Sequence, residues 1–283
     1  MAGRMKKLQN IYKEATNYFG EVKVMFKSIL ISLMMLVAGS GLCLANDLPG
    51  NVEAGRAVPE VETAEVLPHK HTLNCHNTEA EPVQIVCILD RSGSMRQLAG
   101  DTIGGYNAFI EKQRQEKGKA EVTTVLFDDK YEKLIESVDI GKVPELTSKE
   151  YYARGMTALL DAVGRTITSV FSKMEEEGIC PARRRVLFLI MTDGKENDSK
   201  EYDKASVKAL VDTATKEYNW NFVFMGANID SAAEAGAIGI HADHAVNYTH
   251  DAEGVRASFD KMSAAASEMR ETGNVSEDWK NGK

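Results

Sequence analysis

Oxygen-bearing side chains follow an apolar run in the first half of this 283-residue sequence. Asp90, Ser92 and Ser94 stand at alternate positions, and Gly93 between the serines permits a tight turn. Carboxylate and hydroxyl oxygens are hard ligands that suit Mg²⁺, Mn²⁺ or Ca²⁺, and no Cys or His shares the cluster, which disfavours zinc. The spacing indicates a divalent-cation site with Mg²⁺ as the leading candidate, although the same residues could instead cap a helix and satisfy a turn.

Two apolar runs are expected to position this cluster. Val83–Leu89 has the length and β-branched content of a strand that is covered on both faces, and Arg185–Met191 is a second run of this kind. In a doubly wound sheet of the classical order these two strands are neighbours, and their carboxyl ends flank the switch point where ligands bind. The pattern therefore predicts that Asp90 and Asp193 lie on one crevice.

The remaining elements alternate between strand and helix. Further strands are expected at Ala120–Phe127, Lys130–Ile140, Asn221–Met225 and Ala245–Asn247, and helices at Asp101–Glu116, Thr157–Glu177, Asp203–Tyr218, Ser231–Ala235 and Asp251–Arg270. The short turn Asp128–Asp129 makes its strand pair antiparallel, with the more polar second strand at an edge. The sequence thus predicts an α/β, doubly wound, Rossmann-like fold, with a mostly parallel central sheet, one antiparallel edge strand and helices on both faces.

The D-x-S-x-S pattern at residues 90–94 resembles the signature of the von Willebrand factor type A (VWA) family, including its small stand-alone bacterial members. The resemblance covers residues 82–271. Family members carry a metal-ion-dependent adhesion site (MIDAS) that is completed by a Thr in a later loop and an Asp after a later strand. Thr157 in ARGMTALLDAVG and Asp193 after VLFLIMT match these two positions in the family's order.

The resemblance implies roles for all five residues. Ser92, Ser94 and Thr157 would contact the metal directly, and Asp90 and Asp193 would act largely through water. Neutral hydroxyl ligands leave the charge of the cation poorly quenched, and an open coordination position would accept an Asp or Glu carboxylate from a protein partner.

A non-catalytic, divalent-metal-dependent protein-binding module of the adhesion type is the function that the resemblance implies. Two alternatives stay open: a metal-dependent hydrolase or phosphoryl-transfer enzyme, and a cytoplasmic stress-response or assembly module. The enzyme alternative lacks a G-x-S-x-G elbow and a P-loop motif, and Ser92 stands where an aspartyl phosphatase pattern would require a second Asp.

Further loop residues are expected at the same face of the sheet, where they could shape partner choice or be ordinary solvated side chains. They are Tyr152, Arg154, Glu196, Asn197, Asn228 and Asp230.

The N-terminal part reads as a targeting segment. Met25–Ala45 combines a basic start, an apolar stretch and small residues near its end, which is typical of a signal peptide. We expect residues 1–45 to be a signal peptide or a membrane anchor, with Met25 as a possible true start, followed by a linker at 46–81. Residues 272–283 read as a polar C-terminal tail. The expected location is the periplasm, the cell envelope or the exterior, and the alternative is the cytoplasm.

The formal net charge is −8, and residues 1–45 hold six Lys or Arg but only two Asp or Glu, so the rest of the chain is more acidic still. An acidic surface argues against nucleic acid as a partner. The cysteines form no disulfide framework, and a Cys75–Cys180 bridge and unpaired thiols both remain open. A weaker soft-metal set in the linker comprises His69, His71, Cys75 and His76.

Overall fold

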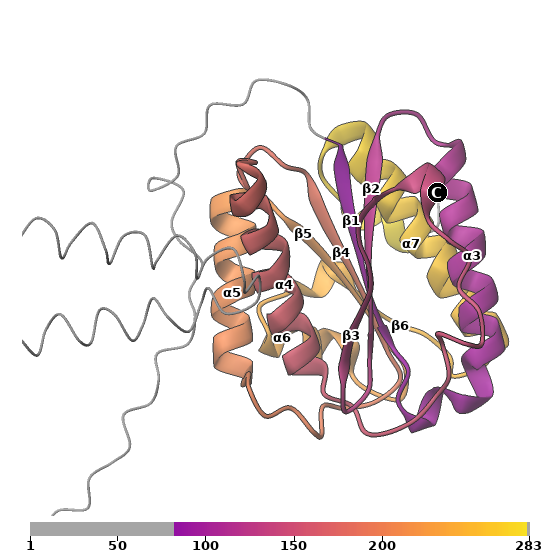
Figure 1. The fold of residues 1–283 in the computed structure, drawn as a ribbon. Helices are drawn as coiled ribbons and strands as arrows, with labels where there is room; N and C mark the ends of the chain where they lie inside the picture. Colours follow the sequence, from indigo (N-terminus) through magenta and orange to yellow (C-terminus); the bar gives the residue numbers. More distant parts are fainter. Residues whose placement is uncertain (1–81, 282–283) are drawn as a thin grey trace, which may run out of the picture. The chain divides into compact units, whose positions relative to one another are not determined.

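The computed structural model describes residues 82–281, which contain a six-stranded sheet in the order β3-β2-β1-β4-β5-β6 (Figure 1). The strands are β1 (Val83–Asp90), β2 (Ala120–Phe127), β3 (Tyr131–Asp139), β4 (Val186–Thr192), β5 (Asn221–Gly226) and β6 (Ala245–Asn247). Neighbouring strands pair in parallel except β2 and β3, which are antiparallel. The predicted fold class is therefore confirmed, including the antiparallel edge strand.

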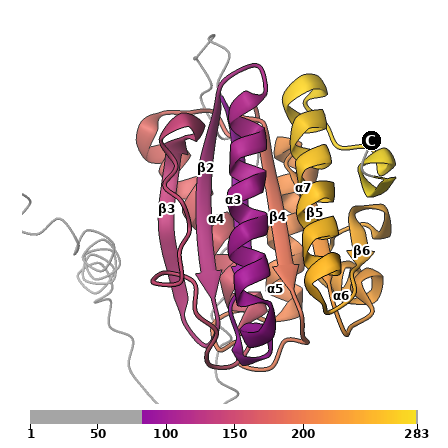
Figure 2. The same cartoon turned by 90° about the vertical axis from the view of Figure 1, so that its right-hand side faces the viewer.

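Helices cover both faces of this sheet, as Figures 1 and 2 show from two directions. The helices are α3 (Ala99–Gln115), α4 (Leu159–Glu177), α5 (Lys204–Tyr218), α6 (Ser231–Ala237) and α7 (Ala252–Thr272). One face carries α3 and α7, which pack side by side, and the other carries α4 and α5. Because strand side chains alternate in direction, Ile85 and Cys87 enter the core under α3 and α7, whereas Val86 and Ile88 enter the core under α4 and α5.

The register of the central strands brings the candidate residues together. Leu89 of β1 lies beside Met191 of β4, so Asp90 and Asp193 leave the sheet at the same edge. The chain turns there into a short 3₁₀ helix, Gly93–Leu98, that leads into α3. A strand pairing over about a hundred residues of sequence thus brings Asp90 and Asp193 to one edge of the sheet.

The interpretation of residues 272–283 as a polar tail is wrong for the described part. After α7 ends, a 3₁₀ helix at Glu277–Asn281 returns to the domain. Val275 and Trp279 are buried in the core under α3 and α7, and the Trp279 indole N–H donates to the Asp243 carbonyl at 3.2 Å. These two apolar residues, four positions apart, attach an otherwise polar segment to the domain. The polar composition of the segment as a whole gave no sign of this docking.

The expected signal peptide or anchor (1–45) and linker (46–81) lie outside the described residues, as do Cys75 and the nearby histidines. Within residues 82–281, no helix has the length and apolar character needed to cross a membrane. Cys180 is disulfide-bonded, and the bridge to Cys75, one of the two alternatives that the sequence left open, involves a residue outside the described ones. Cys87 is a buried free thiol, and its burial raises its pKa to about 12.

Candidate metal centre

Asp90 carries a buried carboxylate at the end of β1, with 1% of the residue exposed. One oxygen accepts the Ser92 backbone N–H at 2.7 Å, and the other accepts the Thr192 hydroxyl at 2.6 Å. Neither donor is cationic. Burial raises the pKa of Asp90 to about 6, and the negative charge of Asp193 acts in the same direction. The carboxylate therefore lacks a positive partner within the described chain.

The two serines and Asp193 form a continuous chain of oxygens next to Asp90. The hydroxyls of Ser92 and Ser94 are 3.0 Å apart, and the Ser94 hydroxyl donates to Asp193 Oδ1 at 2.5 Å. Ser92 and Asp193 are each 2% exposed, whereas Ser94 faces solvent. One side of the cluster, with Ser92 and Asp193, is therefore buried, and the other side, at Ser94, is open to solvent.

Thr157 lies in the loop before α4, two residues ahead of the helix that was expected to begin with it. The residue is 4% exposed, and a Cβ atom built on Gly194 would lie 3.9 Å from its hydroxyl. The Thr157 side chain is therefore next to the backbone that follows Asp193. Its hydroxyl makes no hydrogen bond within residues 82–281, so it is free to bind a ligand. All five sequence-predicted residues meet at this edge of the sheet.

The loops that carry Thr157 and Asp193 are tied to each other. The Thr157 N–H donates to the Asn197 side chain at 2.8 Å, and the Asn197 N–H donates to the Thr157 carbonyl at 3.0 Å. Glu196 accepts the Leu160 N–H at 2.9 Å. Asp161 accepts three N–H groups of the loop after β4, from Lys200, Glu201 and Tyr202. Glu196 and Asn197, predicted as rim residues, thus hold the backbone around Thr157.

Buried ion pairs on Asp128 support the loop that precedes Thr157. Arg91 donates to Asp128 Oδ2 at 3.0 Å, and Arg154 donates to the same oxygen at 2.7 Å. Burial pushes the pKa of Asp128 up, but the hydrogen bond from Arg154 and the charge of Arg91 outweigh it and hold the pKa below its usual range. Arg154 is therefore anchored to the scaffold and only a third exposed.

The rim candidates after β5 have mainly structural contacts. The Asn228 amide donates to the Asp193 carbonyl at 3.4 Å from a left-handed backbone conformation with φ of 57°. Asp230 accepts the Ala233 N–H at 3.1 Å and caps α6. Neither side chain joins the oxygen cluster.

Sequence reasoning missed three residues that contact the cluster. His250 lies just before α7, and its Nε2 is 2.7 Å from Asp193 Oδ2. Thr192 binds the Asp90 carboxylate, and the Tyr151 hydroxyl donates to the Asp90 carbonyl. His250 comes three residues after β6, and residues that follow parallel strands reach the same edge of a sheet. The position of His250 shortly after β6 was the one signal in the sequence that pointed to this residue.

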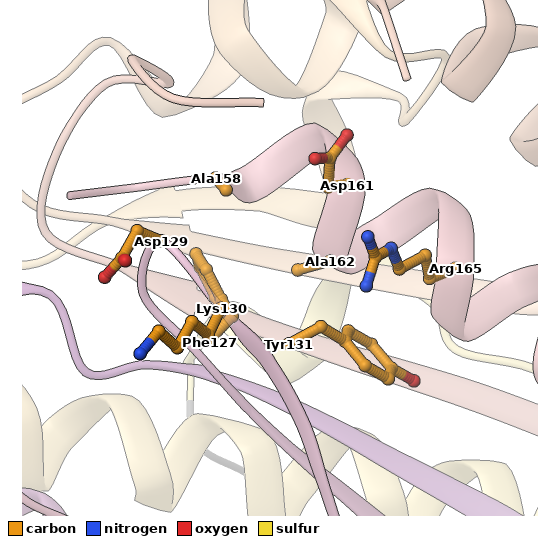
Figure 3. Close-up of a pocket in the computed structure, with 8 residues that line it drawn as sticks. All are labelled: Phe127, Asp129, Lys130, Tyr131, Ala158, Asp161, Ala162 and Arg165. Atoms are coloured by element: carbon orange, nitrogen blue, oxygen red, sulfur yellow. The ribbon is translucent and has the colours of Figure 1, made fainter. Parts of the chain in front are cut away.

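A separate cavity of about 300 Å³ lies between the β2–β3 turn and the start of α4 (Figure 3). Its lining comprises Phe127, Asp129, Lys130, Tyr131, Ala158, Asp161, Ala162 and Arg165. None of the five candidate ligands belongs to it. Arg165 pairs with Glu201 and stacks on the Tyr131 ring, so its charge is already compensated. The cavity is not part of the candidate metal centre.

No protein-family model and no curated protein matches this sequence. Solved structures match over part of this chain. They include a von Willebrand factor type A protein from Catenulispora acidiphila, which is 16% identical with a TM-score of 0.42 over 67% of this chain and 43% of that one. The manganese-loaded TRAP protein of Plasmodium vivax is 17% identical, with a TM-score of 0.43 over 63% of this chain and 72% of that one.

Proximal thread matrix protein 1 from the mussel byssus, with a zinc-occupied MIDAS motif, is 17% identical with a TM-score of 0.45. The match covers 66% of this chain and 46% of that one. This chain therefore spans less than half the length of the Catenulispora and mussel proteins. The sheet order described above is the classical doubly wound order that the sequence predicted.

Proposed function

We propose that this chain is a non-catalytic, divalent-metal-dependent protein-binding module. In this proposal Ser92, Ser94 and Thr157 bind the cation through their hydroxyls, and Asp90 and Asp193 bind it mainly through water. The bound cation supplies an electrophilic position that an Asp or Glu carboxylate of a protein partner occupies. Mg²⁺ is the proposed ion, because the donors are hard oxygens.

The convergence of two buried carboxylates and three hydroxyls carries the proposal. Asp90 and Asp193 are both almost fully buried, and a buried negative charge is costly unless a positive charge compensates it. Asp90 has only neutral donors, so a cation at the neighbouring hydroxyls would supply the missing charge. Within residues 82–281, no group of three or more His, Cys, Asp or Glu is placed to hold a metal, and the proposed site uses hydroxyl oxygens beside its two carboxylates.

The arrangement of Ser94, Asp193 and His250 supports a binding role. These are the residue types of a catalytic triad, but Asp193 lies between the other two and binds both. In a triad the imidazole contacts the nucleophile, so that it can take up the hydroxyl proton. In this arrangement the Ser94 hydroxyl donates to the carboxylate, and within residues 82–281 no hydrogen bond joins it to the imidazole.

Calorimetric titration of the full chain with Mg²⁺ tests the proposed metal site. We expect one binding event that Asp90→Ala and Thr157→Ala each abolish, while Asp260→Ala, which removes an exposed carboxylate on α7, leaves it unchanged. Partner capture from the cell envelope is expected to require the metal and to fail with Asp90→Ala in a variant that is still folded. Equal metal binding by wild type and both site variants would contradict the proposal.

The proposed location outside the cytoplasm depends on residues 1–45. Cell fractionation of the full chain tests it, and recovery in the cytoplasmic fraction would favour the alternative location.

A further inference from the structure

The loop segment 151–157 is hydrogen-bonded at three points to residues 90–94, which we call the metal-binding turn. The Tyr151 hydroxyl donates to the Asp90 carbonyl, the Arg154 N–H donates to the Arg91 carbonyl at 2.9 Å, and the Gly93 N–H donates to the Gly155 carbonyl at 3.2 Å. The contacts come from both ends of the stretch 151–155. The segment therefore runs alongside the turn that carries Ser92 and Ser94.

Two residues of this segment present large apolar side chains to solvent. Tyr152 is 45% exposed and Met156 is 50% exposed, and no other large hydrophobic residue within 82–281 is exposed. A single exposed apolar residue needs no explanation, but both cases here fall within one short segment and beside the same site. Met156 lies between Gly155, which contacts the metal-binding turn, and the candidate ligand Thr157.

The tyrosine ring is held in place by two arginines. Its centroid is 5.6 Å from the Arg91 guanidinium and 5.1 Å from that of Arg154, and Arg154 also donates to its hydroxyl at 2.9 Å. Both arginines are bound to the buried Asp128. The exposed ring is therefore preorganised, and ordering it on binding would cost little conformational entropy. The Arg154 guanidinium is a third exposed next to the ring, whereas its partner Asp128 is fully buried, so the positive member of this pair is the one that faces solvent.

We propose that Tyr152 and Met156 form an apolar docking patch that reads the residue next to the partner's acidic side chain. The occupant is a segment of a partner protein in which an Asp or Glu is followed or preceded, within two positions, by an aliphatic or aromatic residue. This inference rests on the proposed function. The cation and Arg154 complement the charge of the partner's acidic side chain. Met156 is the residue before Thr157, and consecutive Cα atoms are about 3.8 Å apart. A residue next to the partner's acid can therefore reach the patch while the acid binds the cation.

Selection from a phage-displayed library of random seven-residue peptides tests this inference. The full chain is immobilised in Mg²⁺, and bound phage are eluted with EDTA. Four proteins are compared: wild type, the double variant Tyr152→Ser with Met156→Ser, the conservative double variant Tyr152→Phe with Met156→Leu, and Lys112→Ser on the exposed side of α3 as the control. Calorimetry with Mg²⁺ confirms that each variant binds the metal.

We expect acidic peptides from all four proteins, because the cation is retained. Wild type, the conservative variant and the control should also enrich an apolar residue within two positions of the acid, about tenfold over the serine double variant, the ratio expected from burial of one apolar side chain. Acidic peptides without this flanking preference in wild type, or with the same preference in the serine double variant, would overturn the docking patch and leave the proposed function intact. EDTA-eluted peptides without acidic residues would overturn the proposed function and the patch with it.

Discussion

Replacing Asp90 with asparagine removes one buried charge and keeps the shape of the side chain. Burial raises the pKa of Asp90 to about 6 from the ordinary value of 3.8, so the folded protein holds this proton more tightly than the unfolded chain does. The stability that this group contributes is complete below the unfolded pKa and is lost as the pH rises through the folded pKa of about 6. In metal-free protein at about pH 7.5 the ionised carboxylate therefore lowers the free energy of unfolding, and we expect Asp90→Asn to raise it.

The size of this effect follows from the two pKa values. One pKa unit corresponds to about 1.4 kcal/mol. The difference between 3.8 and about 6 therefore corresponds to an increase of about 3 kcal/mol in the free energy of unfolding of the variant. For a domain of about 200 residues, this increase raises the melting temperature by about 6 to 12 °C. The Thr192 hydroxyl can donate or accept, so in the variant it can pair with either the oxygen or the nitrogen of the new side-chain amide.

Thermal melts of wild type and Asp90→Asn in EDTA, from about pH 4 to about pH 8, measure this difference. We expect the variant's advantage to be small at the acid end and to grow as the pH rises through the folded pKa. Mg²⁺ should stabilise wild type and leave Asp90→Asn unchanged, because only the ionised carboxylate serves the cation. Asp260→Asn, which neutralises an exposed carboxylate on α7, is the matched control and should change neither series.

Two results would refute this reasoning. If Asp90→Asn is less stable than wild type in EDTA at every pH, then an uncompensated charge is not what raises the pKa of Asp90. If Mg²⁺ stabilises the variant as much as wild type, then Asp90 does not belong to the metal site.

Three further predictions concern the surroundings of the site. Asn197→Ala removes the side-chain hydrogen bond to the Thr157 backbone, and we expect about tenfold weaker Mg²⁺ binding by calorimetry with about 1 to 2 kcal/mol lower stability; unchanged affinity would show that this tie does not position Thr157. His250→Ala should weaken Mg²⁺ binding about tenfold, and His250→Gln should restore part of the affinity because Gln can still donate to Asp193. Tighter binding by the Ala variant would mean that His250 competes with the cation. Trp279→Ala should lower the free energy of unfolding by about 3 to 5 kcal/mol in chemical denaturation, and a loss below about 1 kcal/mol would mean that the C-terminal 3₁₀ helix does not stabilise the domain.

The central strands were predictable because both of their faces are covered. Every residue of β1 and β4 is buried, and such strands are nearly continuously apolar, so the run Val83–Leu89 could be recognised although it contains Gln84. The antiparallel edge strand followed from the length of one turn. The meeting of Asp90 with Asp193 followed from strand order, a general property of doubly wound sheets.

The sequence could not reveal contacts that depend on where a loop folds back. His250 reaches Asp193 from a polar loop, and nothing in its immediate neighbours distinguishes it from a solvated histidine. Trp279 docks through a single buried ring and one hydrogen bond, in a segment whose composition is polar. Thr157 was expected in the first turn of α4, but its backbone N–H is bound by Asn197, and the helix begins only after that contact.

The three loops around the oxygen cluster are tied together on every side. Segment 151–157 is bonded to the turn after β1, and Thr157 is bonded to the loop after β4. A frame of fixed dimensions discriminates between ions by radius, since Mg²⁺ requires oxygens at about 2.0 to 2.1 Å and Ca²⁺ needs more of them at about 2.3 to 2.6 Å. The hydrogen bonds between the loops thus limit how far the five side chains can move apart, and the proposed preference for Mg²⁺ over the larger ion depends on them.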